Sequence, residues 1–432
     1  MKLWGKGQPI DKKIDAFTVG NDRHYDLILA PFDCQASIVH AKMLHKIDIL
    51  TDTETNQLVK TLDEIRQKAL NNELTIEDEF EDIHSKLEDL LTKIHGDLGK
   101  KIHTARSRND QVLVAFQLYI KNQIDRQIES IVKFVELLLD LAKKNENILM
   151  PGYTHMQVAM PSSFGLWFSG YAETLIDDII SLIASRQIVD QNPLGSAAGY
   201  GTGFGIDRQF TTDLLGFDQI RINPIAVQMG REKICNSILN GIAGVGSTIS
   251  KFCFDICLYS GQEHNFILLD DKITTGSSIM PHKKNPDIFE IIRGKCNLLK
   301  GLPNQLNLLC SNLPTGYHRD LQLSKGIVID GFEELSSCID MTIYALKGIK
   351  IIDDIIKDEK YAHLFSVNTL EKWVKNGMPF REAYKKMGHQ IRNKTFVPDK
   401  ILEHSHIGSL GNLSLDMIRQ KLNQVLGSDD SV

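Results

Sequence analysis

Uninterrupted helical periodicity constrains the fold of this chain more than any other feature of its sequence. From Asp110 to about Lys144, apolar residues recur at intervals of three and four, with no proline or glycine between them. They are Val114, Leu118, Ile124, Ile128, Ile131, Val135, Leu138 and Leu141. This spacing is typical of one face of an α-helix, which at about 1.5 Å per residue would be roughly 50 Å long.

Four further stretches show the same spacing, and we predict long helices over residues 162–191, 228–269, 286–312 and 321–347. Several are apolar around most of their circumference, so neighbouring helices or subunits must cover more than one face. Three glycines in the second of these helices lower helix propensity, and close approach between helices accounts for their presence. The sequence therefore predicts an all-α fold with a central bundle of five long helices, in a homo-oligomer.

Shorter helical segments flank the bundle in sequence. Those in the first hundred residues are separated by Asp, Thr and Asn-Asn signals, and those after about Lys350 surround Gly377 and Pro379. We therefore predict three domains, which are an N-terminal helical domain (1–109), the bundle domain (110–350) and a small C-terminal helical domain (351–432).

Composition limits the classes of partner. A length of 432 residues with 42% hydrophobic residues allows a large core, and a net charge of -6 without a basic run argues against a nucleic-acid surface. We find no signal peptide and no unbroken apolar stretch of membrane-spanning length, so we expect no membrane association.

Seven scattered cysteines show no disulfide framework, which fits the cytoplasm. Cys253 and Cys257 would share a helix face, but buried thiols are commoner than a metal site there.

The segment GSSIMPHKKNP, residues 276–286, begins as a flexible loop at Gly276, Ser277 and Ser278 and ends at the start of a predicted helix. Asn285 suits the N-cap and Pro286 the first turn, so we predict a helix from about Pro286. The free N–H groups and the positive dipole end attract an anion, and Lys283 and Lys284 add full charge. Taken alone, the segment would more simply be a capped helix with solvated lysines.

Four other segments between helices concentrate polar residues or glycine, at 99–111, 150–161, 192–208 and 312–325. In the first, a cluster of polar and basic residues could bind a carboxylate, and Ser107 or Asn109 could equally cap the helix with Asp110 in its first turn. In the second, His155 is a candidate proton carrier, although a lone loop histidine is usually just solvated. The third has five glycines, but no strand precedes it, so a dinucleotide loop is not favoured. In the last, Gln322 and Lys325 share a helix face.

Together these segments resemble the argininosuccinate lyase branch of the fumarase/aspartase superfamily, over about residues 2–325. The matching motifs are KLWG (2–5), Ala36-Ser37 in place of the family's Gly-Ser, EDIH (81–84), HTARSRNDQ (103–111), YTHMQ (153–157), PLGSAAG (193–199), GSSIMPHKKNPD with FEIIRGK (276–295) and GYHRDLQLSK (316–325). The chance of finding all of them in this order in an unrelated helical protein is negligible.

The resemblance implies an all-α homotetramer of three-domain subunits, whose central helices form a twenty-helix bundle. Each active site would be assembled from three subunits. The implied reaction is the reversible β-elimination of argininosuccinate to arginine and fumarate, without a metal or organic cofactor, through a dianionic aci-carboxylate. Cations, helix N-termini and amide donors aimed at that carboxylate would be the main source of acceleration, and Lys283 and Asn285 match the family residues that supply them.

The resemblance also assigns the proton transfers. Ser277 matches the family's catalytic serine, the base for the Cβ proton, and its hydroxyl needs Lys283, backbone N–H groups and exclusion of water to reach the alkoxide. His155 matches the family histidine and Glu290 its carboxylate partner, which would raise the histidine pKa and fix its tautomer. We assign His155 to protonating the departing guanidine, directly or through water. The acid and base labels of Ser277 and His155 have been read both ways in the family.

The substrate-binding positions carried over are Ser37, Arg108, Asn109, Thr154, Asn285, Tyr317, Gln322 and Lys325, with His84 in support. They suit several carboxylates and a guanidinium. The chain departs from the family at Gly5-Lys6-Gly7-Gln8, at Ala159-Met160-Pro161 and at Gly230-Arg231-Glu232-Lys233, and the resemblance is weak beyond Lys350. These departures leave open a preference for an N-acylated argininosuccinate.

Three alternatives compete with this interpretation. A sister lyase acting on adenylosuccinate, fumarate or aspartate would share the Gly-Ser-Ser loop, but HTARSRNDQ and GYHRDLQLSK favour the argininosuccinate branch. A helical binding scaffold would leave the polar clusters unexplained. A catalytically silent, lens-type relative is opposed by the presence of Ser277, His155, Lys283 and Glu290.

Overall fold

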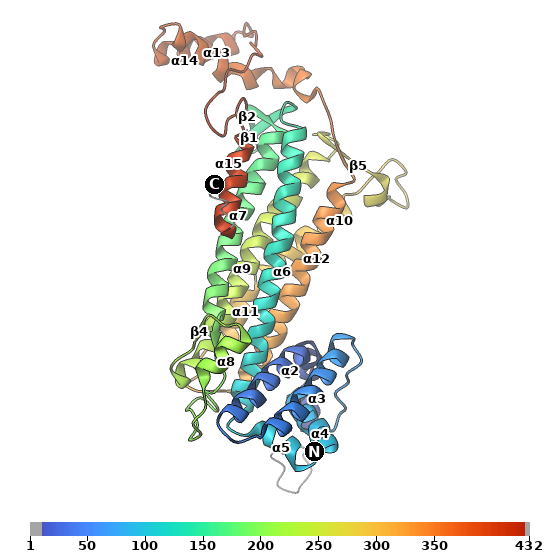
Figure 1. Cartoon of the computed structure of the whole chain (residues 1–432). Coiled ribbons are helices and arrows are strands. Elements are labelled where there is room, and N and C mark those ends of the chain that lie inside the picture. The colour runs from blue at the N-terminus through green and yellow to red at the C-terminus, as the bar shows by residue number, and fades with distance from the viewer. Residues whose placement is uncertain (1–10, 428–432) are drawn as a thin grey trace. The chain divides into compact units, whose positions relative to one another are not determined.

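The structure, a computed structural model, describes residues 11–427, so the KLWG motif and the departure at residues 5–8 lie outside the described residues. The described chain is predominantly helical, and its strands form three small two-stranded sheets (Figure 1). The prediction of an all-α fold is therefore confirmed.

Four of the five predicted long helices are present. They are α6 (Arg108–Lys144), α7 (Phe164–Val189), α9 (Pro224–Tyr259) and α12 (Ser324–Leu346). The fifth, expected over 286–312, is wrong as a single helix, because the chain forms α10 (Asp287–Leu299) and α11 (Leu302–Leu309) instead. Gly301 is the N-cap of α11, and Pro303 lies in the first turn of that helix, where a residue without an N–H group is tolerated. Proline in the interior of a continuous helix would instead remove a backbone hydrogen bond, so α10 does not continue through this residue.

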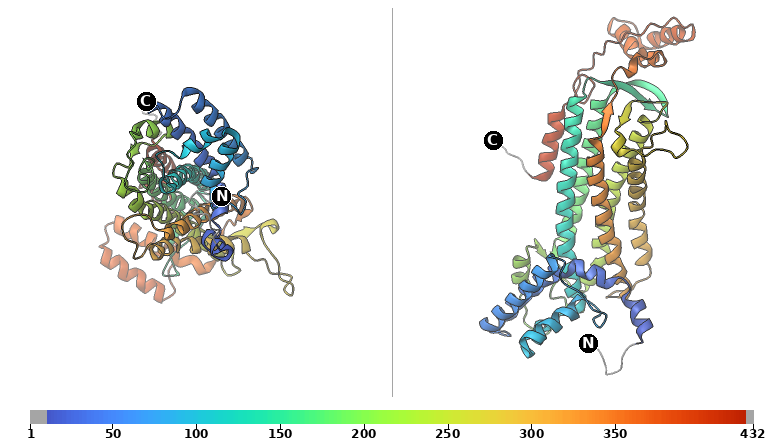
Figure 2. Two further views of the ribbon diagram at one scale, coloured as in Figure 1. Left: turned by 90° about the horizontal axis from the view of Figure 1, so that it is seen from below. Right: turned by 90° about the vertical axis from the view of Figure 1, so that its right-hand side faces the viewer.

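The chain divides into two compact units. The first comprises the residues up to 128, 181–244 and 298–335, and the second comprises 129–180, 245–297 and the residues from 336. The helices α6, α7, α9 and α12 each contribute segments to both units, and within each unit these segments lie side by side (Figures 1 and 2). A division into three domains stays a prediction.

In the first unit, the N-terminal helices pack on one another around an aliphatic core. The helices are α1 (Lys12–Val19), α2 (Asp22–Lys46), α3 (Asp52–Leu70), α4 (Ile83–His95) and the short α5 (Asp97–Lys100). Leu44, Leu58 and Leu91 are fully buried in this core. A capping box at Thr51 and Glu54 fixes the start of α3.

Close packing joins α2 to α12. A methyl group added at Gly326 would lie 2.8 Å from the ring of Tyr25, so only glycine allows this approach. The Tyr25 hydroxyl also donates to Asp330 at 2.9 Å. This contact brings the first turn of α2 beside the start of α12, where the sequence placed candidate binding residues.

Asp110 anchors the glycine-rich segment 192–208 to the start of α6. Its carboxylate is fully buried and accepts hydrogen bonds from the backbone N–H groups of Gly195 (3.0 Å), Ala197 (2.8 Å) and Ser107 (2.9 Å). Two N–H groups of the segment therefore serve the fold. The helix α8 (Arg208–Leu215) and the parallel pair β3 (Gln191–Asn192) and β4 (Gln219–Ile220) complete this region.

In the second unit, an aromatic cluster fills the space between α7 and α9. The ring of Trp167 stacks on that of Phe252 with centroids 5.2 Å apart, and its indole N–H donates to Asp255. After α13 (Ser366–Lys375) and α14 (Phe380–Arg392), the last helix, α15 (Leu415–Leu426), returns to α6 and α7. There Arg419 pairs with Glu136 and Asp140, and Lys421 with Glu173 and Asp177.

Two segments of the second unit differ from expectation. The loop predicted over 150–161 is a hairpin of β1 (Leu149–Thr154) and β2 (Gln157–Ser163). The helix expected to reach residue 269 ends at Tyr259, and the apolar residues that follow form β5 (Ile267–Leu269), which pairs antiparallel with β6 (Ile349–Ile351). In both places a strand partner takes over the backbone hydrogen bonds.

The helix α9 is long and apolar enough to cross a membrane, because one 18-residue window reaches a mean hydropathy of 1.3. The prediction that no segment reaches such a length is therefore too strict. Ile238, Ile242 and Ile249 of this helix are fully buried in the protein, as in a core helix of a soluble enzyme, which passes the same test. All seven cysteines are free thiols.

Candidate active site

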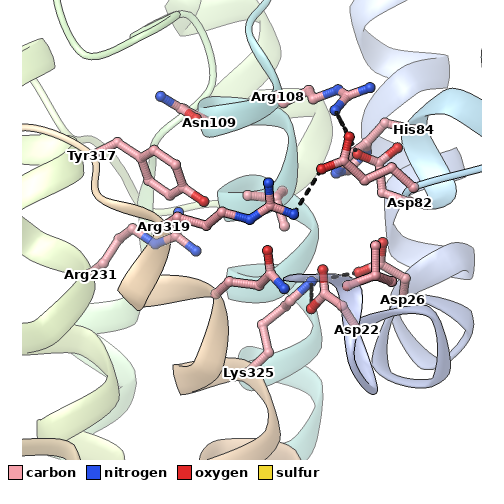
Figure 3. A pocket seen from close by; sticks show the side chains of 14 residues that line it. Asp22, Asp26, Asp82, His84, Arg108, Asn109, Arg231, Tyr317, Arg319 and Lys325 are labelled. Atoms are coloured by element: carbon pink, nitrogen blue, oxygen red, sulfur yellow. Dashed lines mark hydrogen bonds and ion pairs between the residues drawn. The ribbon is translucent and has the colours of Figure 1, made fainter. Parts of the chain in front are cut away.

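A cavity of about 220 Å³ in the first unit collects many of the predicted binding residues (Figure 3). Its lining includes Arg108, Asn109, Tyr317, Gln322 and Lys325, together with His84. These residues come from the starts of α6 and α12, from α4 and from the segment that precedes α12. The short 3₁₀ turn Arg319–Leu323 carries Gln322 and leads directly into α12.

Two arginines and two carboxylates balance one another on one wall of the cavity. Arg108 contacts Glu81 at 3.0 Å and Asp82 at 3.3 Å, and Arg319 contacts Glu81 at 2.9 Å. Arg108 also donates to the Ser85 hydroxyl at 2.8 Å, which fixes its guanidinium at the start of α6. These charges are therefore matched within the protein.

Lys325 lies on the opposite side, between two carboxylates of α2 (Figure 3). Its ammonium is 2.5 Å from Asp22 and 2.6 Å from Asp26, and its side chain is only 3% exposed. Burial lowers the pKa of Lys325, but the charges of Asp26 and Asp22 outweigh this effect and raise it. Burial also raises the pKa of Asp22, to about 6, although Lys325 lowers it. Gln322 donates to the carbonyl of Thr18 at 3.0 Å.

Arg231 of α9 lines the same cavity and is nearly fully buried, with 2% exposure. Its guanidinium carbon lies 5.2 Å from the ring centroid of Tyr317. Nη1 of Arg231 has no hydrogen-bond partner among residues 11–427. Burial lowers the pKa of Arg231, which still remains protonated at any ordinary pH.

Beneath the cavity, His84 forms a buried ion pair with Asp33. The two side chains are 2.7 Å apart, and Asp33 also accepts from Gln111 at 3.2 Å. Burial disfavours charge on both groups, but their mutual attraction prevails, so the pKa of His84 is raised and that of Asp33 is lowered. Ser37 is buried beside them, accepts from Arg106 at 3.0 Å, and lines a smaller neighbouring cavity with His84.

The raised pKa of His84 predicts a pH-dependent stability. A folded-state pKa above the ordinary value of about 6.5 means that the stabilisation is fully present below that pH and is lost as pH rises through the folded-state pKa. We therefore expect the deficit in unfolding free energy of His84→Gln, relative to wild type, to be largest below about pH 6.5 and to shrink as the pH rises above that value. Urea unfolding at several pH values measures it.

His282→Gln is the matched control, because His282 is exposed and lies far along the chain from this pair. Its unfolding curve should follow that of wild type across the same range. A deficit for His84→Gln that stays constant with pH would contradict a charged imidazole in the native state.

In the second unit, Ser277 lies in a loop that is closed at its base. The backbones of Thr275 and Asn285 pair with each other, with N···O distances of 3.2 and 2.8 Å. Within this loop, the half-buried hydroxyl of Ser277 accepts from the N–H groups of Met280 (3.2 Å) and Ile279 (3.4 Å). Donors aimed at this oxygen favour negative charge on it.

The remaining residues around this loop are displayed toward solvent. Lys283 and Glu290 are both exposed, and Glu290 lies in the first turn of α10. That helix begins at Asp287, so Asn285 is one residue too early to be the predicted N-cap. Its side-chain amide instead donates to the carbonyl of Gly276 at 3.3 Å, because the backbone pairing with Thr275 turns it toward the loop.

His155 and Thr154 lie at the tip of the β1–β2 hairpin, where both are exposed. The two residues that make the turn, His155 and Met156, have φ values of 54° and 60°. Positive φ at both central positions is the type I′ turn, which ordinarily selects Asn and Gly. Non-glycine residues held in this conformation store strain of order 1 kcal/mol each, as functional sites often do.

The structure thus gathers the predicted residues into three places. Arg108, Asn109, Tyr317, Gln322 and Lys325 line one cavity, Ser277, Lys283 and Asn285 belong to one loop, and Thr154 and His155 share a hairpin tip. Ser37 is not among the residues that line the larger cavity. No hydrogen bond or ion pair joins His155 to Ser277 or Glu290 within residues 11–427 of one chain.

The sequence analysis missed Asp22, Asp26 and Asp33, whose only local signal is their spacing along α2.

The chain is similar in sequence to known proteins along most of its length. A family model described as lyase matches residues 6–301. An argininosuccinate lyase of Parabacteroides distasonis is 47% identical over 427 residues, which cover 99% of this chain and 96% of that protein. An argininosuccinate lyase of Sorangium cellulosum is 35% identical over 426 residues, which cover 98% of this chain and 99% of that protein.

Solved structures share the fold. An EDDS lyase in complex with formate matches with a TM-score of 0.74 and 20% identity, covering 98% of this chain and 90% of its own. A class II fumarase from Schistosoma mansoni matches with a TM-score of 0.72 and 17% identity, covering 96% and 95%. Both likenesses support the fold that the sequence motifs implied.

Proposed function

The chain belongs to the lyase family, and we propose that it is an argininosuccinate lyase, which cleaves argininosuccinate to arginine and fumarate. The observation that carries the proposal is the near full-length match to the Parabacteroides enzyme. The sister activities and the silent relative weighed above have no comparable support, because the relatives with high identity over the whole chain are argininosuccinate lyases.

The chemistry requires removal of a proton from a carbon next to a carboxylate. Ser277 takes this proton as its alkoxide, which the N–H groups of Ile279 and Met280 stabilise before the transfer, and the negative charge passes to the substrate. The resulting aci-carboxylate carries two negative charges. Lys283 and the positive dipole end of α10 follow the serine in sequence, and they stabilise this charge.

The nitrogen leaves as the guanidinium of arginine, which requires a proton from an acid. We assign this proton to His155, directly or through water, with Glu290 of the assembled site holding the imidazole in the protonated form. In the reverse direction each residue takes the opposite role. Which of Ser277 and His155 acts first as base stays a prediction.

We further propose a cytoplasmic homotetramer whose active sites combine residues of three subunits. Support comes from the exposure of His155, Lys283 and Glu290, because no hydrogen bond or ion pair among residues 11–427 joins any of these three to another or to Ser277. Large apolar side chains on α10, α11 and α12 are also exposed, namely Ile291 (58%), Leu298 (76%), Leu308 (68%) and Tyr344 (62%). Such surfaces are covered when helices of different subunits pack together.

The direct test is cleavage of argininosuccinate by the purified protein. We expect fumarate to appear, seen as rising absorbance in its ultraviolet band, and arginine to appear in equal amount. Adenylosuccinate, aspartate and malate serve as controls for the sister activities and should give no fumarate. Absence of fumarate from argininosuccinate, while the oligomer is intact by light scattering, would reject the assignment.

A further inference from the structure

The hairpin that carries His155 is short and depends on the rest of its unit to hold its shape. An isolated two-stranded hairpin is marginally stable at best in water, and the turn at His155 and Met156 is strained. Strain of this kind persists only where the surrounding structure over-determines it. Among the described residues 153–158, which span the tip, only Tyr153 is half-buried and the others are exposed. Tyr153 is therefore the side chain through which the unit can hold the tip.

A β-bulge lies directly before Tyr153. The pairing of β1 with β2 shifts register between Pro151 and Tyr153, and beyond the shift Tyr153 pairs with Val158. Gly152 lies at the shift, and a methyl group added there would lie 2.9 Å from the carbonyl oxygen of Met160, so a larger residue would push the strands apart. Bulges bend a strand and re-aim its side chains, often beside active sites. Here the bulge precedes the turn that carries the imidazole.

The side chain of Tyr153 fits into a corner formed by two other segments of the second unit. One is the turn after α9, where the ring of His264 meets that of Tyr153 edge to face, with centroids 5.8 Å apart. The other is the 3₁₀ turn Glu359–Phe365, whose Tyr361 is hydrogen-bonded to the hydroxyl of Tyr153. Burial, and then this hydrogen bond, raise the pKa of Tyr153, so its hydroxyl is protonated and can donate.

The partner of this hydrogen bond is itself held firmly. Tyr361 is 4% exposed, its ring contacts that of Phe266 at a centroid distance of 6.2 Å, and the ammonium of Lys360 lies 4.9 Å from its ring centroid. Phe266 is in turn only 1% exposed. Side chains locked by packing and by hydrogen bonds are what keep a catalytic group in its productive geometry. The hydroxyl of Tyr153 is thus bonded to a fixed point of the unit.

We propose that Tyr153, through its hydrogen bond to Tyr361, is a positioning residue for His155 and sets the direction in which the imidazole leaves the hairpin tip. The inference rests on the proposed function, in which His155 protonates the departing guanidine. Proton transfer requires the two heavy atoms to lie within hydrogen-bond distance, and a displacement of about 1 Å can cost about 100-fold in rate. A bond that served only the stability of the fold would leave this geometry unchanged.

Three variants separate positioning from stability. Tyr153→Phe and Tyr361→Phe each delete one hydroxyl and keep the ring. Each should lower kcat by about tenfold and leave KM for argininosuccinate within about twofold of wild type, because the lining of the binding cavity is untouched. The double variant should lose no more kcat than either single one, because all three lack the same bond. Its unfolding midpoint should nevertheless recover toward wild type, since each single variant leaves one hydroxyl without its partner and the double variant leaves none.

Substitution of His155 itself provides a second readout. Added to His155→Asn, Tyr153→Phe should lower the residual turnover no further, since no imidazole is left to position. Tyr384→Phe is the matched control, because Tyr384 is 64% exposed on α14, and this variant should keep the kcat and the unfolding midpoint of wild type. Turnover is measured as arginine release by chromatography, on oligomers shown to be intact by light scattering.

The outcomes distinguish the inference from the proposed function. The positioning role is overturned if Tyr153→Phe keeps kcat within about twofold of wild type, or if the double variant recovers kcat together with its unfolding midpoint. It is also overturned if Tyr153→Phe slows His155→Asn by the same factor as wild type. In each of these cases the lyase activity stands. Absence of fumarate release from argininosuccinate by wild type would instead reject the proposed function, and the inference with it.

Discussion

Ser277→Ala should lose argininosuccinate cleavage by at least about 100-fold, and by up to about 10⁴-fold, because it removes the group that we propose takes the Cβ proton. The hydroxyl is held in place by two backbone N–H donors rather than by side chains, so its loss leaves the loop closure between Thr275 and Asn285 intact. Binding of L-arginine and assembly should therefore stay near wild type. Fumarate release and calorimetry on the same preparation measure both quantities.

The adjacent serine provides a matched control. Ser278 is exposed, and no hydrogen bond of its side chain to residues 11–427 supports the loop. Ser278→Ala should keep turnover within about threefold of wild type if Ser277 alone carries the proton, since surface substitutions usually have small effects. Near-normal turnover in Ser277→Ala, or equal losses in the two variants, would require another base.

Mixing two inactive variants should restore activity if active sites are shared between subunits. Ser277→Ala and His155→Asn each remove one proposed catalytic group, and each variant alone should have little activity. After subunits exchange in an equal mixture, a site that takes Ser277 from one chain and His155 from another is intact with a probability of about one quarter. We therefore expect recovery of about 25% of wild-type activity.

The control for this experiment is a chain that carries both substitutions. When the double variant is mixed with wild type, its subunits should exchange at the same rate. A site that takes both residue 277 and residue 155 from double-variant chains should stay inactive. Exchange itself is followed by mass spectrometry of the intact oligomers. Full exchange without any recovery from the two single variants would show that Ser277 and His155 act within one chain.

Most of the fold could be predicted from periodicity, and the errors have physical causes. The limits of α6 were predicted within two residues because no breaker interrupts its apolar face. The apolar pattern also continued through Gly301 and Pro303, where the chain starts a new helix, and through Ile267–Leu269, which forms a strand. A strand at that position depends on pairing with Ile349–Ile351, a partner distant in sequence that local periodicity does not reveal.

The candidate site shows the same division between local and distant information. Motifs identified Lys325 and His84 as site residues, but not the carboxylates that set their charge. Asp26 contacts Lys325 across 299 positions of sequence, and Asp33 contacts His84 across 51. Such pairs follow from the packing of α2 against other elements, which a single sequence does not specify. The lack of a partner for Arg231 is likewise visible only once its surroundings are known.

The left-handed hairpin tip has a consequence for engineering. A stabilisation programme guided by turn preferences would replace His155 and Met156 with Asn-Gly and would gain rigidity, because the native pair occupies a conformation that these residues resist. The same exchange would delete the imidazole. With the proton transfer that we propose for His155, heat tolerance and turnover are opposed at residue 155, and only the neighbouring methionine is free to be improved.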